Sequence, residues 1–290
     1  MQIITLALQN YRNYIQQICN FSPSLNMLIG SNAQGKTNLI EAIYYLSIGK
    51  SYRSVKDEQL IRWGEDTFQI KGKVANRQGQ TVIEVNYKKN ARHSKNIRIG
   101  GLPLSKNDEL GGHLTSVLFS PDNMSIIKGS PQERRKFLDY DISQVSRVYA
   151  KNIQKYQRLL NQRNILLKRL SLKKATENSI ISELEIWDRQ LAETGAEIIE
   201  KRLQTIVKLN PLTRLMQRKL SKGQENLEIQ YIFNRKETIQ PGTDIREKLL
   251  QAREENLKND LKYGITQWGP HRDDLAITLN GINLKQFGSQ

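Results

Sequence analysis

Apolar and polar residues alternate in short runs over the first part of the chain, a pattern that predicts β-strands. Three such runs cover residues 3–8, 15–21 and 25–29. Apolar residues then recur at helical spacing, which predicts a helix over residues 36–48. Strand-like alternation returns over residues 66–118, broken by short polar and glycine-containing dipeptides. This second set of runs predicts an antiparallel sheet.

The pattern becomes helical at Pro131, which suits the first position of a helix and follows a serine, Ser130, suited to the N-cap. From there apolar residues step by threes and fours to Leu167, and the same rhythm resumes after a polar break at residues 173–178. Two long amphipathic segments with a short link predict an antiparallel helical hairpin that ends before Pro211. The remaining predicted elements are a strand at 227–233, a helix at 244–263 and a strand at 275–279.

A glycine-rich loop separates the predicted strand at 25–29 from the predicted helix at 36–48, and it reads GSNAQGKT. It matches the phosphate-binding pattern G-x-x-x-x-G-K-[ST] at every fixed position. Glycines there let successive N–H groups turn inward around a polyphosphate, and the helix N-terminus adds partial positive charge. Lys36 is expected to reach the terminal phosphates, and Thr37 to place its hydroxyl on Mg²⁺. The predicted nucleotide-binding residues of the loop are Gly30, Ser31, Asn32, Ala33, Gln34, Gly35, Lys36 and Thr37.

The net charge of the chain indicates what kind of molecule it binds. The 290 residues include 45 Lys and Arg against 29 Asp and Glu, a formal net charge of +16 that favours a polyanion such as nucleic acid. No apolar run approaches the roughly 18 residues of a membrane span, and no signal-peptide pattern opens the chain. A single cysteine, Cys19, excludes an internal disulfide, and three scattered histidines give no metal-ligand spacing. We therefore expect a cytoplasmic protein without a membrane partner.

Basic residues concentrate in the first half of the predicted helical hairpin. Between Lys151 and Lys174 the chain carries eight Lys or Arg and no acid. Such a stretch is either a solvated helix face or a contact for a phosphate backbone, because a one-signed face repels itself without an anion. The residues singled out for DNA binding under the second alternative are Lys155, Arg158, Arg163 and Lys168.

Several motifs, in order along the whole chain, are similar to those of the RecF family of bacterial recombination-mediator ATPases, which is related to the head domains of structural-maintenance-of-chromosomes (SMC) proteins. The blocks that carry the resemblance are LQNYRNY from residue 8, GSNAQGKTNLIE from 30, KSYRS from 50, EQLIR from 58, FSPD from 119, KGSP from 128, RRKFLD from 134 and GPHRDDL from 269. The resemblance implies an α/β P-loop fold of the cassette type with an SMC-like head. It also implies an appended antiparallel β-subdomain and an inserted helical arm. The implied domains are residues 1–124 for the first part of the head, 125–262 for the arm and 263–290 for the return to the head.

The same resemblance implies ATP-dependent binding of DNA in recombinational repair and at replication gaps. ATP with Mg²⁺ would close two heads into a homodimer on single-stranded or gapped DNA, and RecR- and RecO-type mediator proteins would be further partners. The alternative, from a different class, is a DNA-binding module that binds nucleotide without turning it over. A GTPase is a third possibility, but the N-K-x-D motif for base recognition is absent.

The resemblance also assigns roles to individual residues. It places Arg12 near the base or phosphates of the nucleotide, Arg53 at an arginine position that reaches the γ-phosphate or DNA, and Asp122 near the loop that senses Mg²⁺ and the γ-phosphate. The alternatives without a functional role are a surface arginine for Arg12 and an ordinary loop arginine for Arg53. For Asp122 the alternative is a residue of a simple turn. The cluster HRDD at 271–274 suggests catalysis, yet a paired acid beside a turn is more often a cap or an ion pair with Arg272.

The last residues, FGSQ at 287–290, correspond to the opening of the signature motif of cassette ATPases. By the resemblance, Ser289 would contact the γ-phosphate held by the opposite subunit. The acids that position Mg²⁺ and the attacking water follow this motif in the family, and the sequence has no run of four apolar residues ending in such an acid. Turnover depends on these groups. We therefore expect a truncated form that binds ATP without hydrolysing it.

Overall fold

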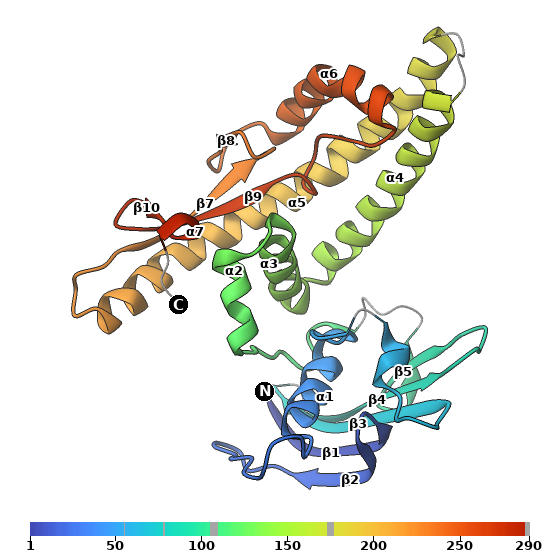
Figure 1. The fold of residues 1–290 in the computed structure, drawn as a ribbon, viewed down its shortest axis with the longest axis vertical. Helices are drawn as coiled ribbons and strands as arrows, with labels where there is room; N and C mark the ends of the chain where they lie inside the picture. The colour runs from blue at the N-terminus through green and yellow to red at the C-terminus, as the bar shows by residue number, and fades with distance from the viewer. Residues whose placement is uncertain (55, 78, 105–109, 173–176, 288–290) are drawn as a thin grey trace. The chain divides into compact units, whose positions relative to one another are not determined.

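The computed structural model of the chain describes residues 1–54, 56–77, 79–104, 110–172 and 177–287. The chain divides into two compact units (Figure 1). The first, here called the head unit, comprises Met1–Leu118 and Gln144–Arg147. The second, the arm unit, comprises Phe119–Ser143 and Val148–Gln290. Each unit has a hydrophobic core of its own.

The head unit is an antiparallel sheet covered by one helix. The six strands follow the order β2-β1-β3-β4-β5-β6. Their bounds are Gln2–Tyr11 (β1), Tyr14–Asn20 (β2), Thr67–Asn76 (β3), Gly79–Lys88 (β4), Lys95–Ile99 (β5) and Leu102–Pro103 (β6). Helix α1, Lys36–Ile48, packs on β3 and β4 and buries Leu39, Tyr45 and Leu46 against the alternate apolar residues of the strands. The predicted antiparallel sheet and the predicted first helix are thus confirmed.

The predicted strand at residues 25–29 is wrong. This segment has no regular secondary structure, and Leu25, Met27 and Ile29 are 76%, 76% and 87% exposed. Apolar alternation reports only the tendency to form a strand, whereas a strand also needs a neighbour that supplies hydrogen-bond partners. The described strands of the head pair with one another and leave this segment without one.

The arm unit is built on two long helices joined by residues 173–176. These helices are α4, Arg147–Leu172, and α5, Glu177–Leu220. They run antiparallel, because Asn152 bonds Glu197 near one end and Arg163 bonds Asp188 nearer the link. The predicted helical hairpin is therefore confirmed, although the predicted polar break at 173–178 lies partly outside the described residues. The short flanking helices and turns are Pro121–Met124 (η3), Ser125–Lys128 (α2), Pro131–Val145 (α3), Ile245–Tyr263 (α6) and Leu284–Phe287 (α7).

A second sheet packs on the arm helices in the order β10-β9-β7-β8. Its strands are Leu227–Phe233 (β7), Glu237–Thr238 (β8), Asp274–Leu279 (β9) and Ile282–Asn283 (β10). The sequence assigned residues 263–290 to the head, and the structure corrects this assignment for the described part. Strand β9 pairs with β7 from Leu227 opposite Leu279 to Ile232 opposite Asp274, so the segment belongs to the arm unit.

Two helix boundaries differ from the sequence prediction. The first long helix is interrupted at Ser146, between α3 and α4, at residues that cluster with the head unit. The second was expected to end before Pro211 but continues to Leu220. The side chain of Asn210 accepts from the N–H of Ile229 and donates to its C=O, at 2.8 and 2.9 Å. These bonds hold the turn at the proline against β7 and offset the backbone bond that proline removes.

Candidate functional site

The phosphate loop lies on the surface of the head unit and leads directly into α1. Gly35 has φ of +101°, and a Cβ there would lie 2.7 Å from both side-chain polar atoms of Asn13 and 2.9 Å from the ring of Tyr14. Only glycine fits this position, for steric as well as conformational reasons. The N-terminus of α1 has no side-chain cap and no acid in its first turn. Its backbone N–H groups and its dipole are therefore available to an anion.

Lys36 and Thr37 lie at the start of this helix. The ammonium of Lys36 crosses the loop and donates to the carbonyls of Gly30 and Ser31, both at 2.7 Å. Thr37 is exposed, and so are the loop residues 30–34. The structure thus brings all eight predicted residues into one open loop at the N-terminus of α1, with the lysine held beside it.

The turn between β1 and β2 supports the loop, a role that the sequence analysis missed. Asn13 donates to the carbonyl of Gln34 at 3.2 Å, and the hydroxyl of Tyr14 donates to the carbonyl of Gly35 at 3.1 Å. Asn38, in the first turn of α1, donates to Asn13 at 2.8 Å. The block LQNYRNY contained both residues, but sequence spacing alone did not indicate that this hairpin reaches the loop.

Arg12 lies in the same turn, and its guanidinium is occupied by protein groups. Its Nε and one Nη donate to the two carboxylate oxygens of Glu41 at 3.0 and 2.7 Å, and it also donates to Ser54 and to the carbonyl of Gln59. Glu41 is fully buried and also accepts from Ser51. Burial lowers the pKa of Arg12, but the hydrogen bonds and the charge of Glu41 outweigh burial and raise that pKa. In this geometry Arg12 neutralises Glu41, so its predicted contact with nucleotide stays a prediction.

Arg53 has a side chain that is more exposed to solvent than that of Arg12. Its side chain is 40% exposed, donates to Asn38 at 3.1 Å and lies 3.8 Å from Glu41. Because Asn38 is in the first turn of α1, this cation lies next to the end of the helix that faces the loop. Asp122 belongs to the short turn Pro121–Met124 in the arm unit, and its side chain is not among those described. The roles of Arg53 and Asp122 stay predictions, and Ser289 lies outside the described residues.

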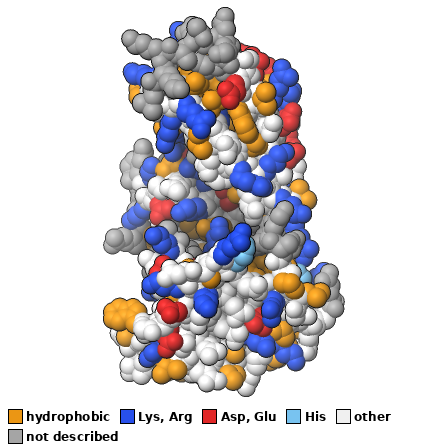
Figure 2. Space-filling view, turned by 90° about the vertical axis from the view of Figure 1, so that its right-hand side faces the viewer, with side chains coloured by type: hydrophobic (Ala, Val, Ile, Leu, Met, Phe, Trp, Pro, Cys, Tyr) orange, Lys and Arg blue, Asp and Glu red, His pale blue; other side chains and the backbone are white. Residues whose placement is uncertain are grey.

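Basic side chains of the arm occupy the surface of α4. Lys155, Arg158 and Lys168 are exposed, as are Lys151 and Arg169, whereas Lys173 and Lys174 lie outside the described residues. Lys and Arg side chains are spread widely over the face drawn in Figure 2. The DNA contacts predicted for Lys155, Arg158 and Lys168 are compatible with this exposure and stay predictions.

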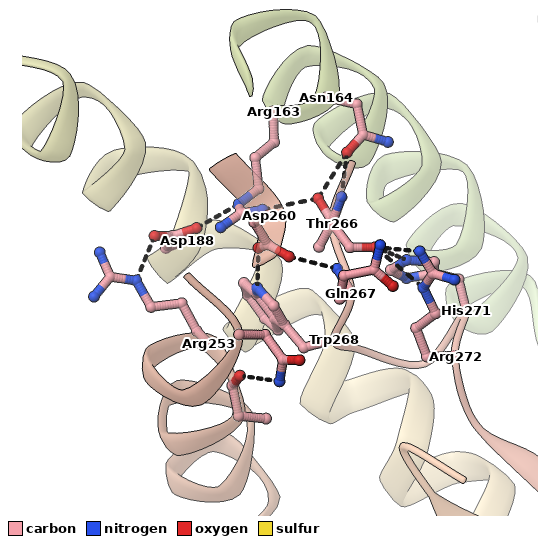
Figure 3. A network of polar contacts seen from close by, with 12 residues as sticks. Arg163, Asn164, Asp188, Arg253, Asp260, Thr266, Gln267, Trp268, His271 and Arg272 are labelled. Carbon is pink, nitrogen blue, oxygen red and sulfur yellow. Dashed lines mark hydrogen bonds and ion pairs between the residues drawn. The ribbon is translucent and has the colours of Figure 1, made fainter. Parts of the chain in front are cut away.

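Arg163 requires a correction. It is fully buried between α4, α5 and α6, where it donates to Asp188 at 2.6 Å, to Asp260 at 2.7 Å and to Thr266 at 2.9 Å (Figure 3). Its guanidinium also lies over the ring of Trp268. A cation held in the interior by two carboxylates cannot contact a DNA backbone. The charge count along the sequence could not reveal this, because both acids come from other helices.

The cluster at residues 271–274 also has structural partners. Asp273 accepts from the hydroxyl of Tyr231 at 2.5 Å and from the N–H of Asn234 at 2.7 Å, and Asp274 forms a two-point ion pair with Arg134. Burial raises the pKa of Asp273 to about 6. These contacts join β9 to β7 and α3, and they support the structural interpretation of the cluster.

Among the described residues, no group of three or more His, Cys, Asp or Glu is arranged to hold a metal ion. The contact between Thr37 and Mg²⁺ stays a prediction. None of the described helices combines the length and the apolar character that a membrane crossing needs.

The fold and the phosphate loop place this chain in the class of P-loop ATPases. Residues 2–230 match the model of the RecF/RecN/SMC N terminal domain. The chain is 42% identical over its full length to a DNA replication and repair protein RecF of Alkaliphilus oremlandii and 38% identical to that of Clostridium acetobutylicum, and it covers 77% of each. It also resembles the solved structure of the recombination mediator protein RecF with ATP, with a TM-score of 0.91, 37% identity, and coverage of 99% of this chain and 76% of the other. The chain belongs to the RecF family, as its sequence motifs predicted.

Proposed function

We propose that this protein binds DNA under the control of ATP in recombinational repair and in the processing of replication gaps. The observation that carries the proposal is the open phosphate loop. Lys36 is held across it, Gly35 fits where no other residue does, and the N-terminus of α1 is uncapped. Membership of the RecF family supports the repair function, since relatives that the chain matches over its full length are named DNA replication and repair proteins.

ATP is the proposed ligand of the loop, with Mg²⁺ bridging its phosphates and the hydroxyl of Thr37. Two related structures are those of the recombination mediator protein RecF with ATP and with ATPrS. Arg53 is the proposed second cation at the phosphates, because its exposed guanidinium lies beside Asn38 at the start of α1.

The proposed DNA contact is one face of α4, here called the α4 face and defined by Lys151, Lys155, Arg158 and Arg169. Residues spaced by three, four and eleven positions share a side of a helix. All four are exposed, and Lys168 lies beside them. RecF-type homodimerisation and partners of the RecO and RecR type are part of the same proposal, in keeping with structures described as belonging to the RecFOR pathway.

The test combines one loop variant with one arm variant. Lys36→Ala should abolish binding of a fluorescent ATP analogue and make DNA affinity independent of ATP, without unfolding either unit. The triple variant Lys155→Gln, Arg158→Gln, Arg169→Gln should flatten the log–log dependence of DNA affinity on salt by roughly 0.7 to 0.9 for each DNA phosphate that the variant no longer neutralises.

The matched control removes three exposed charges from the end of α5 by changing Arg214, Arg218 and Lys219 to Gln. It should leave the salt slope unchanged. Equal ATP affinity in Lys36→Ala and parent would refute the nucleotide site. An equal slope in the arm variant and its control would refute the α4 face.

A further inference from the structure

A small pocket with polar and apolar lining opens on the surface of the arm unit, apart from the phosphate loop and from the α4 face. It has a volume of about 230 Å³ and is lined by α3, α4, α5 and the loop that precedes β9. The side chains that matter for its chemistry are Arg135, Lys136, Tyr156, Gln157, Arg202 and His271. Pockets that bury whole drug-sized ligands measure about 300–1,000 Å³, so this cavity suits a smaller group.

The floor of the cavity is fixed by bonds within the protein. Arg202 forms a two-point ion pair with Asp139, with both distances 2.9 Å, and donates to the carbonyl of Pro270 and the hydroxyl of Tyr231. The charge of this arginine is therefore neutralised. It shapes the floor but adds little to the attraction of a ligand.

His271 contributes a neutral ring to the same floor. Its Nε2 lies 3.2 Å from the carbonyl of Thr266 and must carry the proton, so its Nδ1 accepts from the hydroxyl of Tyr156 at 2.8 Å. Burial lowers the pKa of His271 to about 3. Gly269, with φ of +107°, permits this contact, since a Cβ there would lie 2.3 Å from the hydroxyl of Tyr156.

The wall formed by α3 carries positive charge that no ion pair within the described residues neutralises. Three other arginines of the arm each form an ion pair with a carboxylate: Arg134, Arg163 and Arg202. Among the described residues, no carboxylate forms an ion pair with Arg135 or Lys136. Arg135 donates to the carbonyl of Asp273 at 2.5 Å, which fixes its guanidinium. Burial lowers the pKa of Arg135, and the charges of Arg202 and Arg235 lower it further, against the opposing charges of Asp273 and Asp274. An anion in the cavity would relieve this crowding of like charges.

From the cavity, its neutralised floor and its unpaired cations, we propose that the arm unit has a second phosphate-binding site, here called the arm pocket. Its ligand is the phosphate of a nucleotide. Arg135 offers the planar donor geometry that phosphate oxygens accept, and Lys136 adds a mobile charge at the rim. The amide of Gln157 and the apolar Ile153, Ile198 and Pro270 line the space left for the sugar or base. The nucleotide could be free or part of a DNA strand, and the probes below separate these two sources.

The experiment uses the full chain with Lys36→Ala, which removes binding at the phosphate loop. Thymidine, thymidine monophosphate, inorganic phosphate and a short phosphorylated oligothymidylate are titrated by calorimetry at low salt. The double variant Arg135→Gln, Lys136→Gln should bind the phosphate-bearing probes about tenfold more weakly, as expected when charge-assisted bonds are removed. Lys136→Gln alone, a change at an exposed position, should show the same direction with a smaller effect.

The matched control is Arg218→Gln, Lys219→Gln, an exposed arginine–lysine pair at the end of α5 in the same unit. It should leave the affinities unchanged. A larger loss of affinity for the oligonucleotide than for the monophosphate in the pocket variant identifies a strand as the source, and the reverse identifies a free nucleotide. The arm pocket is refuted if no phosphate-bearing probe binds, if thymidine binds as tightly as its monophosphate, or if the control loses as much affinity as the pocket variant.

Discussion

The head and the arm both contain arginines bound to buried acids, and they use them differently. In the head, Arg12 neutralises Glu41 while Arg53, close to the same acid, stays 40% exposed beside the phosphate loop. In the arm, Arg163 forms ion pairs with Asp188 and Asp260 in the interior. One arrangement leaves a second arginine partly exposed to a ligand, and the other uses its arginine to join three helices. Charge counted along the sequence cannot distinguish the two.

The largest effect that would test this comparison is expected at Arg163. Arg163→Met should lower the free energy of unfolding by about 3–5 kcal/mol, because it leaves Asp188 and Asp260 buried with one cation fewer. Lys155→Met, an exposed change on the same helix, should alter it by no more than about 0.5 kcal/mol. Urea unfolding followed by circular dichroism measures both. A stable Arg163→Met protein with weakened DNA binding would restore Arg163 as a contact residue.

An intermediate effect should separate the two arginines of the head. Arg12→Ala should destabilise the head unit by about 3 kcal/mol, since Glu41 would keep its burial but lose its two-point ion pair. Arg53→Ala should leave stability nearly unchanged and weaken binding of an ATP analogue about tenfold, because one charge-assisted bond to the phosphates would be missing. Thermal unfolding and analogue titration are compared in both variants. The distinction fails if Arg12→Ala is as stable as the parent or if Arg53→Ala binds the analogue normally.

The smallest effect concerns an acid of the arm that lies in a buried environment. Burial raises the pKa of Asp141 from 3.8 to about 6. The folded state therefore favours the protonated acid, and this stabilisation is complete below pH 3.8 and is lost as the pH rises through about 6.

Asp141→Asn should thus stabilise the protein near neutral pH, by about 1 kcal/mol once solvent screening of this half-buried group is allowed for. The gain should fall to less than half near pH ~4.5, within the titration window. Melting temperatures of variant and parent at both pH values measure it. A gain of the same size at both pH values would show that ionisation of Asp141 is not its cause.

The sequence determined the parts of this protein that depend on local pattern. The phosphate loop was predicted residue by residue, because its chemistry resides in backbone conformation and in Lys36 and Thr37. Helix α1, the head sheet and the hairpin of α4 and α5 followed from hydrophobic periodicity, and the ordered motifs identified the family. These features need no knowledge of which distant residues meet.

The tertiary structure decided which of the predicted groups are available. In the folded protein Arg163 is buried, and Arg12 forms an ion pair with Glu41. Residues 25–29 have no neighbouring strand, and β9 pairs with β7 of the arm unit. The tertiary structure also brought Arg135 and His271 to one cavity from positions far apart in the chain. The physical reason is the same in each case. Burial, pairing and charge neutralisation depend on contacts between distant segments, and neither periodicity nor composition records those contacts.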